Sequence, residues 1–305
     1  MLNLLHGSDH EMTFRLYSLL FLLLITRSYG QERTISLGIF TGATTTYSWD
    51  EGVNRDPRYE TRYDVKLAPI GISYGVDYEG YGFVLTPGLI NIGQKYNVIN
   101  TVGGTEGVRK AKIQYFNLPI AFKIHIIDLS FFKVSVLAGG SAAFLLSARE
   151  TVSHRAAKLR FPSAVYPILP EDYQIEYDGV VSPAVSNYPM LGKTDYRSLQ
   201  IFADAGFRSD WDITDAWRVS FDFRVCYGLF EPRTDAYVDQ LNARQTWYDV
   251  PGKRRDLYAS LTVGIARYIE IDHKSTARKK NIHTSPRKAK GRTPWPEPRR
   301  KRPKS

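Results

Sequence analysis

Few residues of this chain stand at spacings that support a known chemistry. Gly192-Lys193-Thr194 matches the end of a phosphate-binding loop, but the glycine that such a loop needs five positions earlier is Asn187. The sequence contains no HExxH, GxGxxG or GxSxG motif, so the usual signatures of zinc proteases, dinucleotide-binding enzymes and serine hydrolases are absent. We therefore expect no catalytic residue, no cofactor and no metal site.

His125 is the best candidate for a catalytic base. It falls on the polar face of an alternating segment, where it could act as the base of a barrel enzyme that attacks lipid or peptide. Such a base needs a serine and an acid beside it, and the sequence does not place them there. We therefore predict a structural histidine in a non-enzymatic protein, with the enzyme as the alternative.

The single cysteine, Cys226, excludes a disulfide framework, a CxxC redox centre and a cysteine-rich zinc module. It alternates with Arg224 and Gly228 along a predicted strand. This position predicts a packed, unreactive thiol.

The charge of the chain is concentrated at its end. The 305 residues carry a formal net charge of +10, yet residues 273–305 alone hold 13 Lys/Arg and one acid, Glu297. The remaining residues hold 28 basic and 30 acidic side chains, so the body is nearly neutral. A nucleic-acid partner is therefore not expected, and the Pro-containing tail is predicted to be disordered.

The N-terminal segment has the layout of a secretory signal peptide. An apolar run over residues 16–25 follows Arg15 and precedes Ser28-Tyr29-Gly30, with small residues at the positions expected before a cleavage site. The run is about half as long as a membrane-spanning helix. We predict a signal peptide over 1–30, a folded body over 31–272 and a disordered tail over 273–305, with Met12 as an alternative start to Met1.

The body alternates with a period of two, which indicates β-strands. In residues 217–229 every odd position is apolar, and the even positions between are Arg, Ser, Asp, Arg, Cys and Gly. Eight strands are expected, over residues 34–45, 70–78, 83–92, 116–124, 131–146, 199–211, 217–229 and 257–269.

The connections between these strands alternate in length. Long segments at 47–62, 94–110, 149–197 and 231–256 alternate with short ones at 79–80, 128–130 and 212–216. This segregation is typical of an up-and-down antiparallel transmembrane β-barrel with short periplasmic turns, long external loops and periplasmic termini. A soluble sandwich or lipocalin-like barrel is the alternative, because the period does not say which face is buried.

Two sets of side chains favour the membrane barrel. Trp217 and Tyr227 lie ten residues apart, about 25 Å along a tilted strand, which predicts a lipid-facing girdle. The opposite face mixes small residues with charges of both signs, and an eight-stranded barrel is just wide enough for its side chains to fill. We predict a structural charge network in the lumen, formed by Asp204, Arg208, Arg218, Asp222 and Arg224.

Several stretches resemble the eight-stranded outer-membrane β-barrel family common in Bacteroidetes, often labelled PorT-like or "porin family". They are Leu37-Gly38-Ile39 to Gly42, the strand around Asn117-Leu118-Pro119, residues 137–148, and the segments 202–206 and 223–229. The resemblance spans about residues 33–270 and implies a location in the outer membrane of a Gram-negative bacterium. The resemblance does not imply catalysis. Some members of the family are linked to type IX protein secretion or gliding, so the resemblance also implies such a role as a possibility for this chain. The basic tail after Tyr268-Ile269 departs from the family pattern, which ends on an aromatic residue.

We accordingly expect a non-enzymatic barrel that contacts outer-membrane lipid through its apolar face. Its external loops, above all 149–197, are expected to contact other envelope or secretion-complex proteins. The tail is expected to bind anionic periplasmic partners. A small diffusion channel is a further alternative.

Overall fold

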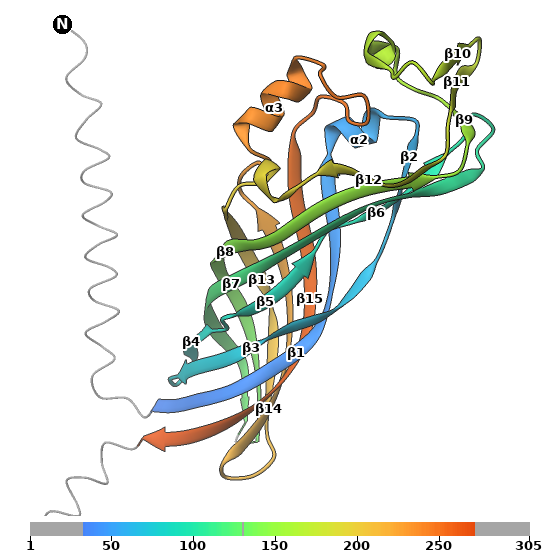
Figure 1. Ribbon diagram of the computed structural model, residues 1–305. Helices are drawn as coiled ribbons and strands as arrows, with labels where there is room; N and C mark the ends of the chain where they lie inside the picture. Colours follow the sequence, from blue (N-terminus) through green and yellow to red (C-terminus); the bar gives the residue numbers. More distant parts are fainter. Residues whose placement is uncertain (1–32, 130, 272–305) are drawn as a thin grey trace, which may run out of the picture. The chain divides into compact units, whose positions relative to one another are not determined.

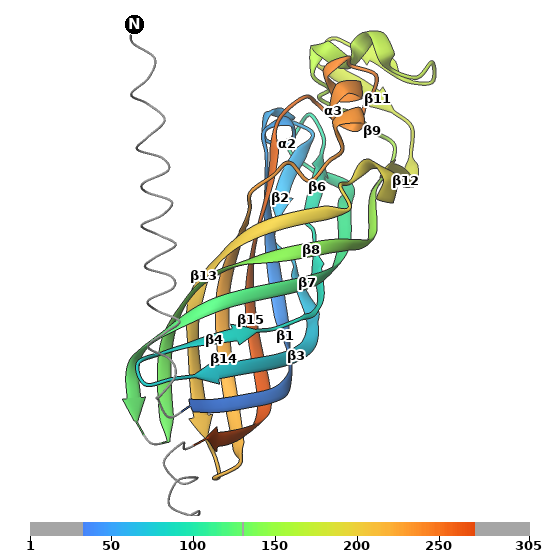
Figure 2. The same ribbon diagram turned by 90° about the vertical axis from the view of Figure 1, so that its left-hand side faces the viewer.

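The computed structural model describes residues 33–129 and 131–271. The predicted signal peptide and the tail from residue 273 lie outside these residues. In the described part the chain forms one large antiparallel sheet that closes on itself, because β1 pairs with β15 at one junction and β7 pairs with β8 at another (Figures 1 and 2).

Eight positions make up the closed ring of strands. In ring order they are β1 (Arg33–Asp50), β3 (Val65–Asp77), β4 (Tyr81–Leu85) together with β5 (Gly88–Ile92), β7 (Thr105–Leu129), β8 (Phe132–His154), β13 (Leu199–Asp212), β14 (Trp217–Gly228) and β15 (Arg254–Ile271). These positions correspond to the eight expected strands. The expected strand 83–92 is in fact two strands, because residues 86 and 87 interrupt it and Pro87 has no N–H to donate to a ladder.

The long connections contain more regular structure than expected, most of all in the second and third of them. The expected loop 94–110 is mostly a hairpin, in which β6 (Lys95–Ile99) pairs with the first residues of β7. The expected loop 149–197 begins inside β8, which continues to His154. The ladder between β7 and β8 continues from Ala111 opposite Glu150 to Gly107 opposite His154, so the backbone groups of both strands stay paired beyond the apolar part of the wall.

Alternation along the strands places the polar face inside the ring. In β14 the odd residues from Trp217 to Tyr227 face outward, whereas Arg218, Asp222 and Arg224 are buried. The outward faces of neighbouring strands carry large apolar side chains as well, such as Ile265 in β15 and Ile39 in β1. A soluble sandwich would bury this apolar face. The continuous exposed apolar surface instead requires a lipid environment.

Three folded connections gather at one end of the ring, which we call the crown, residues 51–64, 155–198 and 229–253 (Figures 1 and 2). It contains α2 (Glu51–Arg55), β2 (Tyr59–Arg62), a three-stranded sheet of β9 (Ala157–Leu159), β10 (Gln174–Glu176) and β11 (Gly179–Ser182), the 3-10 turns η1 (Ser163–Ile168) and η2 (Lys193–Asp195), β12 (Val185–Leu191) and α3 (Asp235–Asn242). The short turns lie at the opposite end of the ring, together with the first residues of β1 and the last residues of β15 (Figures 1 and 2). None of the helices in the described residues is long and apolar enough to cross a bilayer.

Candidate functional site

Ion pairs fill the lumen near the end with the short turns. The lower network consists of Asp77, Lys123, Arg208, Asp210, Asp212, Arg218, Ser220, Asp222 and Arg224. Lys123 of β7 contacts Asp77 of β3 and lies 3.7 Å from Asp210 of β13. Arg218 of β14 donates to Asp77 at 2.9 Å, so one chain of charges crosses the lumen between strands on opposite sides.

Of the five residues predicted for the lumen, three contact one another directly. Arg224 donates to both carboxylate oxygens of Asp222, at 2.8 and 2.7 Å, and Arg208 contacts the same carboxylate at 3.4 Å. Arg218 is also buried, but its partners are Asp77 and Asp212. Asp204 forms no ion pair within the described residues and accepts a hydrogen bond from Ser141 at 3.4 Å.

A small cavity lies beside Asp204 and Cys226 in the lumen. Its volume is about 50 Å³, room for one or two water molecules, and Arg208, Asp222 and Tyr258 also line it. The thiol of Cys226 is buried, with the residue 2% exposed. The lumen at this level is therefore packed and polar.

His125 lies at the edge of the lower network with a serine and an acid beside it. The Nδ1 atom of His125 is 2.8 Å from the hydroxyl of Ser135, and its Nε2 atom is 3.8 Å from Asp77. The sequence did not reveal these neighbours, because they come from β8 and β3. Ser135 is fully buried, and Asp77 is already held by Lys123 and Arg218.

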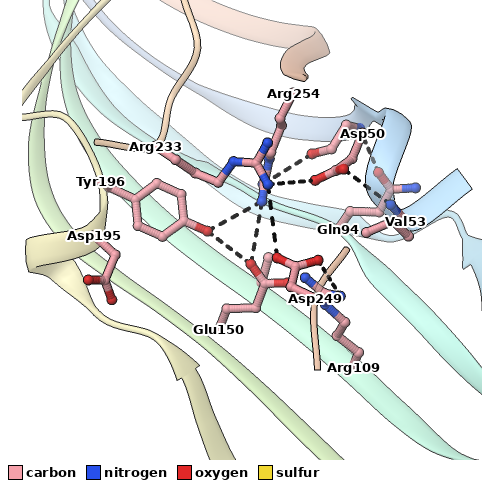
Figure 3. A network of polar contacts seen from close by, with 12 residues as sticks. Asp50, Val53, Gln94, Arg109, Glu150, Asp195, Tyr196, Arg233, Asp249 and Arg254 are labelled. Atoms are coloured by element: carbon pink, nitrogen blue, oxygen red, sulfur yellow. Dashed lines mark hydrogen bonds and ion pairs between the residues drawn. The ribbon is translucent and has the colours of Figure 1, made fainter. Parts of the chain in front are cut away.

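A second set of charges closes the lumen at the crown end (Figure 3). This upper network consists of Asp50, Arg109, Glu150, Tyr196, Arg233, Asp249 and Arg254. Glu150 of β8 is its central anion, with Arg109 of β7 at 2.5 Å, Arg254 of β15 at 3.4 Å and the hydroxyl of Tyr196 at 3.0 Å. The network thus joins three strands and a crown segment around one carboxylate.

The crown supplies the other half of the upper network. Arg233 lies 3.5 Å from Asp50 and 3.9 Å from Asp249, while Asp50 also caps α2 by accepting from the backbone N–H of Gly52 and Val53. Burial alone would raise the pKa of Asp249, but the guanidinium groups of Arg109 and Arg233 hold it below its ordinary value. Asp249 is therefore ionised at neutral pH and fixes the crown to the strands.

Sequence reasoning missed the whole upper network. Three of its charged residues lie in segments that the sequence predicts to be loops, namely Arg109, Glu150 and Arg254. The alternation of inward and outward side chains along a strand was therefore not applied to them. Lys123 lies two positions before His125 and so falls on the same polar face, but nothing in the sequence pairs it with Asp77, 46 positions away. The extension of the alternation beyond the apolar part of β7 and β8 is the signal that could have revealed Arg109 and Glu150.

The crown has an apolar core of its own. Leu159, Phe161, Val165, Tyr173 and Val180 pack together with residues of β6, β8 and the segment before β15. The guanidinium of Arg58 lies 4.2 Å from the centre of the Phe161 ring and also pairs with Asp56. These contacts fold the crown around its own core and pack it against the ends of β6 and β8.

The two residues predicted for the lipid-facing girdle both point outward. Trp217 is 48% exposed near one end of β14, and Tyr227 is 47% exposed near the other end. The apolar side chains of Val219, Phe221, Phe223 and Val225 face outward between them. In the described residues no group of three or more His, Cys, Asp or Glu side chains is arranged to hold a metal ion.

The profile of a known family, the "Outer membrane protein beta-barrel domain", matches residues 31–231. A search of curated proteins found no match. Similar solved structures include Ail, the attachment invasion locus protein of Yersinia pestis, at 8% identity and a TM-score of 0.33, covering 79% of this chain and 99% of that one. The outer membrane protein OprG from Pseudomonas aeruginosa has 8% identity, a TM-score of 0.31 and coverages of 79% and 96%.

The outer membrane protease OmpT from Escherichia coli is also similar, at 6% identity and a TM-score of 0.36, with 79% of this chain and 97% of that chain covered. TM-scores and identities this low do not distinguish among the roles of these proteins. The profile match, by contrast, covers about two thirds of the sequence.

Proposed function

The chain belongs to the outer membrane protein β-barrel family, and from this premise we propose that it is a non-enzymatic barrel whose crown contacts another protein of the cell envelope. The observation that carries the proposal is the crown itself. It is folded around its own core, yet it leaves Ile175 of β10 exposed at 58% and Tyr177, in the turn between β10 and β11, exposed at 107%. Exposed aromatic and aliphatic side chains on a rigid support are typical of protein contact surfaces.

The proposal includes an orientation with the crown outside the cell and the termini in the periplasm. It is supported by the segregation of the folded connections from the short turns, which barrels of Gram-negative outer membranes share. The basic tail, outside the described residues, would then meet anionic partners in the periplasm. Within the family we propose the PorT-like branch of Bacteroidetes and an accessory role in a secretion or envelope complex, on the basis of the resemblance around Asn117-Leu118-Pro119.

A diffusion channel is the less favoured role. Two ion-paired networks fill the lumen, one near the crown and one near the short turns. The cavity beside the lower network has a volume of only about 50 Å³. A solute would have to separate buried ion pairs to pass.

Site-directed cross-linking tests the proposed contact and the orientation together. In intact cells, the tagged full chain with Tyr177→Cys and a membrane-impermeant thiol cross-linker should give an adduct with an envelope protein. Cys226 is buried and adds little background. Ile265→Cys, on the lipid-facing wall, is the matched control and should give no adduct. Absence of an adduct at Tyr177 contradicts the contact, and an adduct formed only in ruptured cells reverses the orientation.

The contacts of His125 favour one second candidate, an enzyme that acts on lipid or peptide. In that case Ser135 would be the nucleophile and His125 its base. The burial of Ser135 and the engagement of Asp77 with two cations speak for the structural role instead.

Replacement of Ser135 by alanine separates these two roles. We expect the purified wild-type barrel to cleave neither phospholipid nor fluorogenic peptides above background, and Ser135→Ala to change nothing in these assays. Ser141→Ala, another buried lumen serine, is the control. Wild-type activity that is lost in Ser135→Ala but kept in Ser141→Ala would establish the enzyme.

A further inference from the structure

The wall of the ring is incomplete between β3 and β5. Only Ile70 and Gly71 of β3 pair with β5, and the residues of β3 before Pro69 pair with β1 alone. Pro69 cannot donate a backbone hydrogen bond, so the ladder stops there. Past this point β5 bonds to side chains of β1 instead: Thr44 donates to the carbonyl of Asn91, and the N–H of Gly93 donates to Thr46.

This seam contains a cavity. Its volume is about 430 Å³, and it opens on the outer surface of the ring. Four lysines line it, Lys66, Lys95, Lys110 and Lys112, together with a single acid, Asp64. The cavity therefore has an excess of positive charge.

The lysines are only partly neutralised. Lys95 pairs with Asp64 at 2.8 Å, and the ammonium of Lys66 donates to the backbone carbonyls of Gly93 and Ala111 at 2.7 and 3.3 Å. Lys110 and Lys112 are exposed and have no acid partner within the described residues. Four like charges on adjacent strands repel one another unless an anion is bound among them.

The seam lies where the apolar wall ends. On β5 and β7 the outward pair Leu89 and Phe116 is followed toward the crown by the pair Asn91 and Gln114. Further along β7 comes Lys110, which pairs with Lys95 at the start of β6. Leu67, which also lines the cavity, is 79% exposed. An apolar margin directly beside a cluster of lysines matches a lipid molecule, whose acyl chains adjoin an anionic headgroup.

We propose that this seam is a binding site for a phosphorylated lipid headgroup, with Lys66, Lys95, Lys110 and Lys112 around the phosphate and Leu67 against the acyl chains. The site is separate from the crown surface, so it does not depend on the proposed protein contact. Free phosphate shares the chemistry of the headgroup, but the apolar margin favours the lipid.

The test measures lipid binding by the full chain in detergent, by native mass spectrometry with added diphosphorylated lipid A. The wild-type protein should bind one lipid A at this site. Lys110→Gln combined with Lys112→Gln should lower the association constant roughly thirtyfold, since each interfacial lysine contributes about 1 kcal/mol. Lys193→Gln combined with Lys253→Gln removes the same charge from exposed crown positions and should leave the constant unchanged.

Further ligands distinguish the source of the phosphate. Dephosphorylated lipid A should bind weakly, and inorganic phosphate should compete only at much higher concentration. Equal binding of dephosphorylated lipid A overturns the proposal, as does an equal effect of the two double variants. If inorganic phosphate binds as tightly as lipid A, the site is for free phosphate and the lipid assignment is wrong. An unchanged gel shift between unheated and boiled samples shows that each variant has folded.

Discussion

Glu150→Gln is expected to lower the free energy of unfolding by about 3–5 kcal/mol. Glu150 is fully buried, and its carboxylate is shared by Arg109, Arg254 and the hydroxyl of Tyr196. Glutamine has nearly the same shape but no charge, so two buried guanidinium groups lose their common anion. Arg109 keeps Asp249 at 3.4 Å and Arg254 keeps Asp256 at 3.1 Å, so the cost arises from the loss of the one anion that the two desolvated cations share.

Urea titration of the purified barrel in detergent, followed by the gel shift between unheated and boiled samples, measures this loss. Glu176→Gln is the matched control, because Glu176 pairs with Lys158 at an exposed position of the crown, with side-chain exposures of 48% and 30%. That change should cost less than about 1 kcal/mol. Similar unfolding midpoints for the two variants would show that the upper network contributes little to stability.

Phe223→Arg is expected to cost roughly 2–4 kcal/mol, because it places a cation on the lipid-facing wall near the middle of the bilayer. Phe223 is 43% exposed and lies between Phe207 and Leu261 of the adjacent strands. Arg224→Lys, one position along, keeps a cation beside Asp222 of the same strand in the lumen and should cost less, although it loses the two-point contact of the guanidinium.

A folding titration into lipid vesicles compares these variants. Val102→Arg provides a control for the added charge, because Val102 is 88% exposed in the turn between β6 and β7. It should fold like the wild-type protein. Equal tolerance of Phe223→Arg and Arg224→Lys would contradict the outward orientation of Phe223.

The local pattern of the sequence was sufficient to predict the strands and their faces. A period of two is a property of the extended backbone itself, so the outward position of Phe223 and the inward position of Arg224 could be read without knowing any neighbouring strand. The same holds for the antiparallel order, because short connections can join only adjacent antiparallel strands. Pro87, inside the expected third strand, is the local signal for the break between β4 and β5, because proline has no N–H for the ladder.

Contacts between distant parts of the chain required the tertiary structure. Alternation shows that Arg208, Arg218 and Arg224 face the lumen, but the partners of Arg218 depend on the register and closure of the ring, which bring Asp77 beside it across 141 positions. For the same reason Ser135 and Asp77 could not be placed beside His125 from sequence.

The crown and the seam were the least predictable features. Glu150 joins Arg109 and Arg254 only because β7 and β8 extend past the apolar wall, and the crown folds over them. Lys66 and Lys110 converge because the ladder breaks at Pro69 and β5 bends toward β1. The sequence by itself determined the period, the faces and the exposed apolar wall, since these depend on the geometry of a single strand. The tertiary structure decided which charges pair and where the wall opens, since both depend on the register between strands.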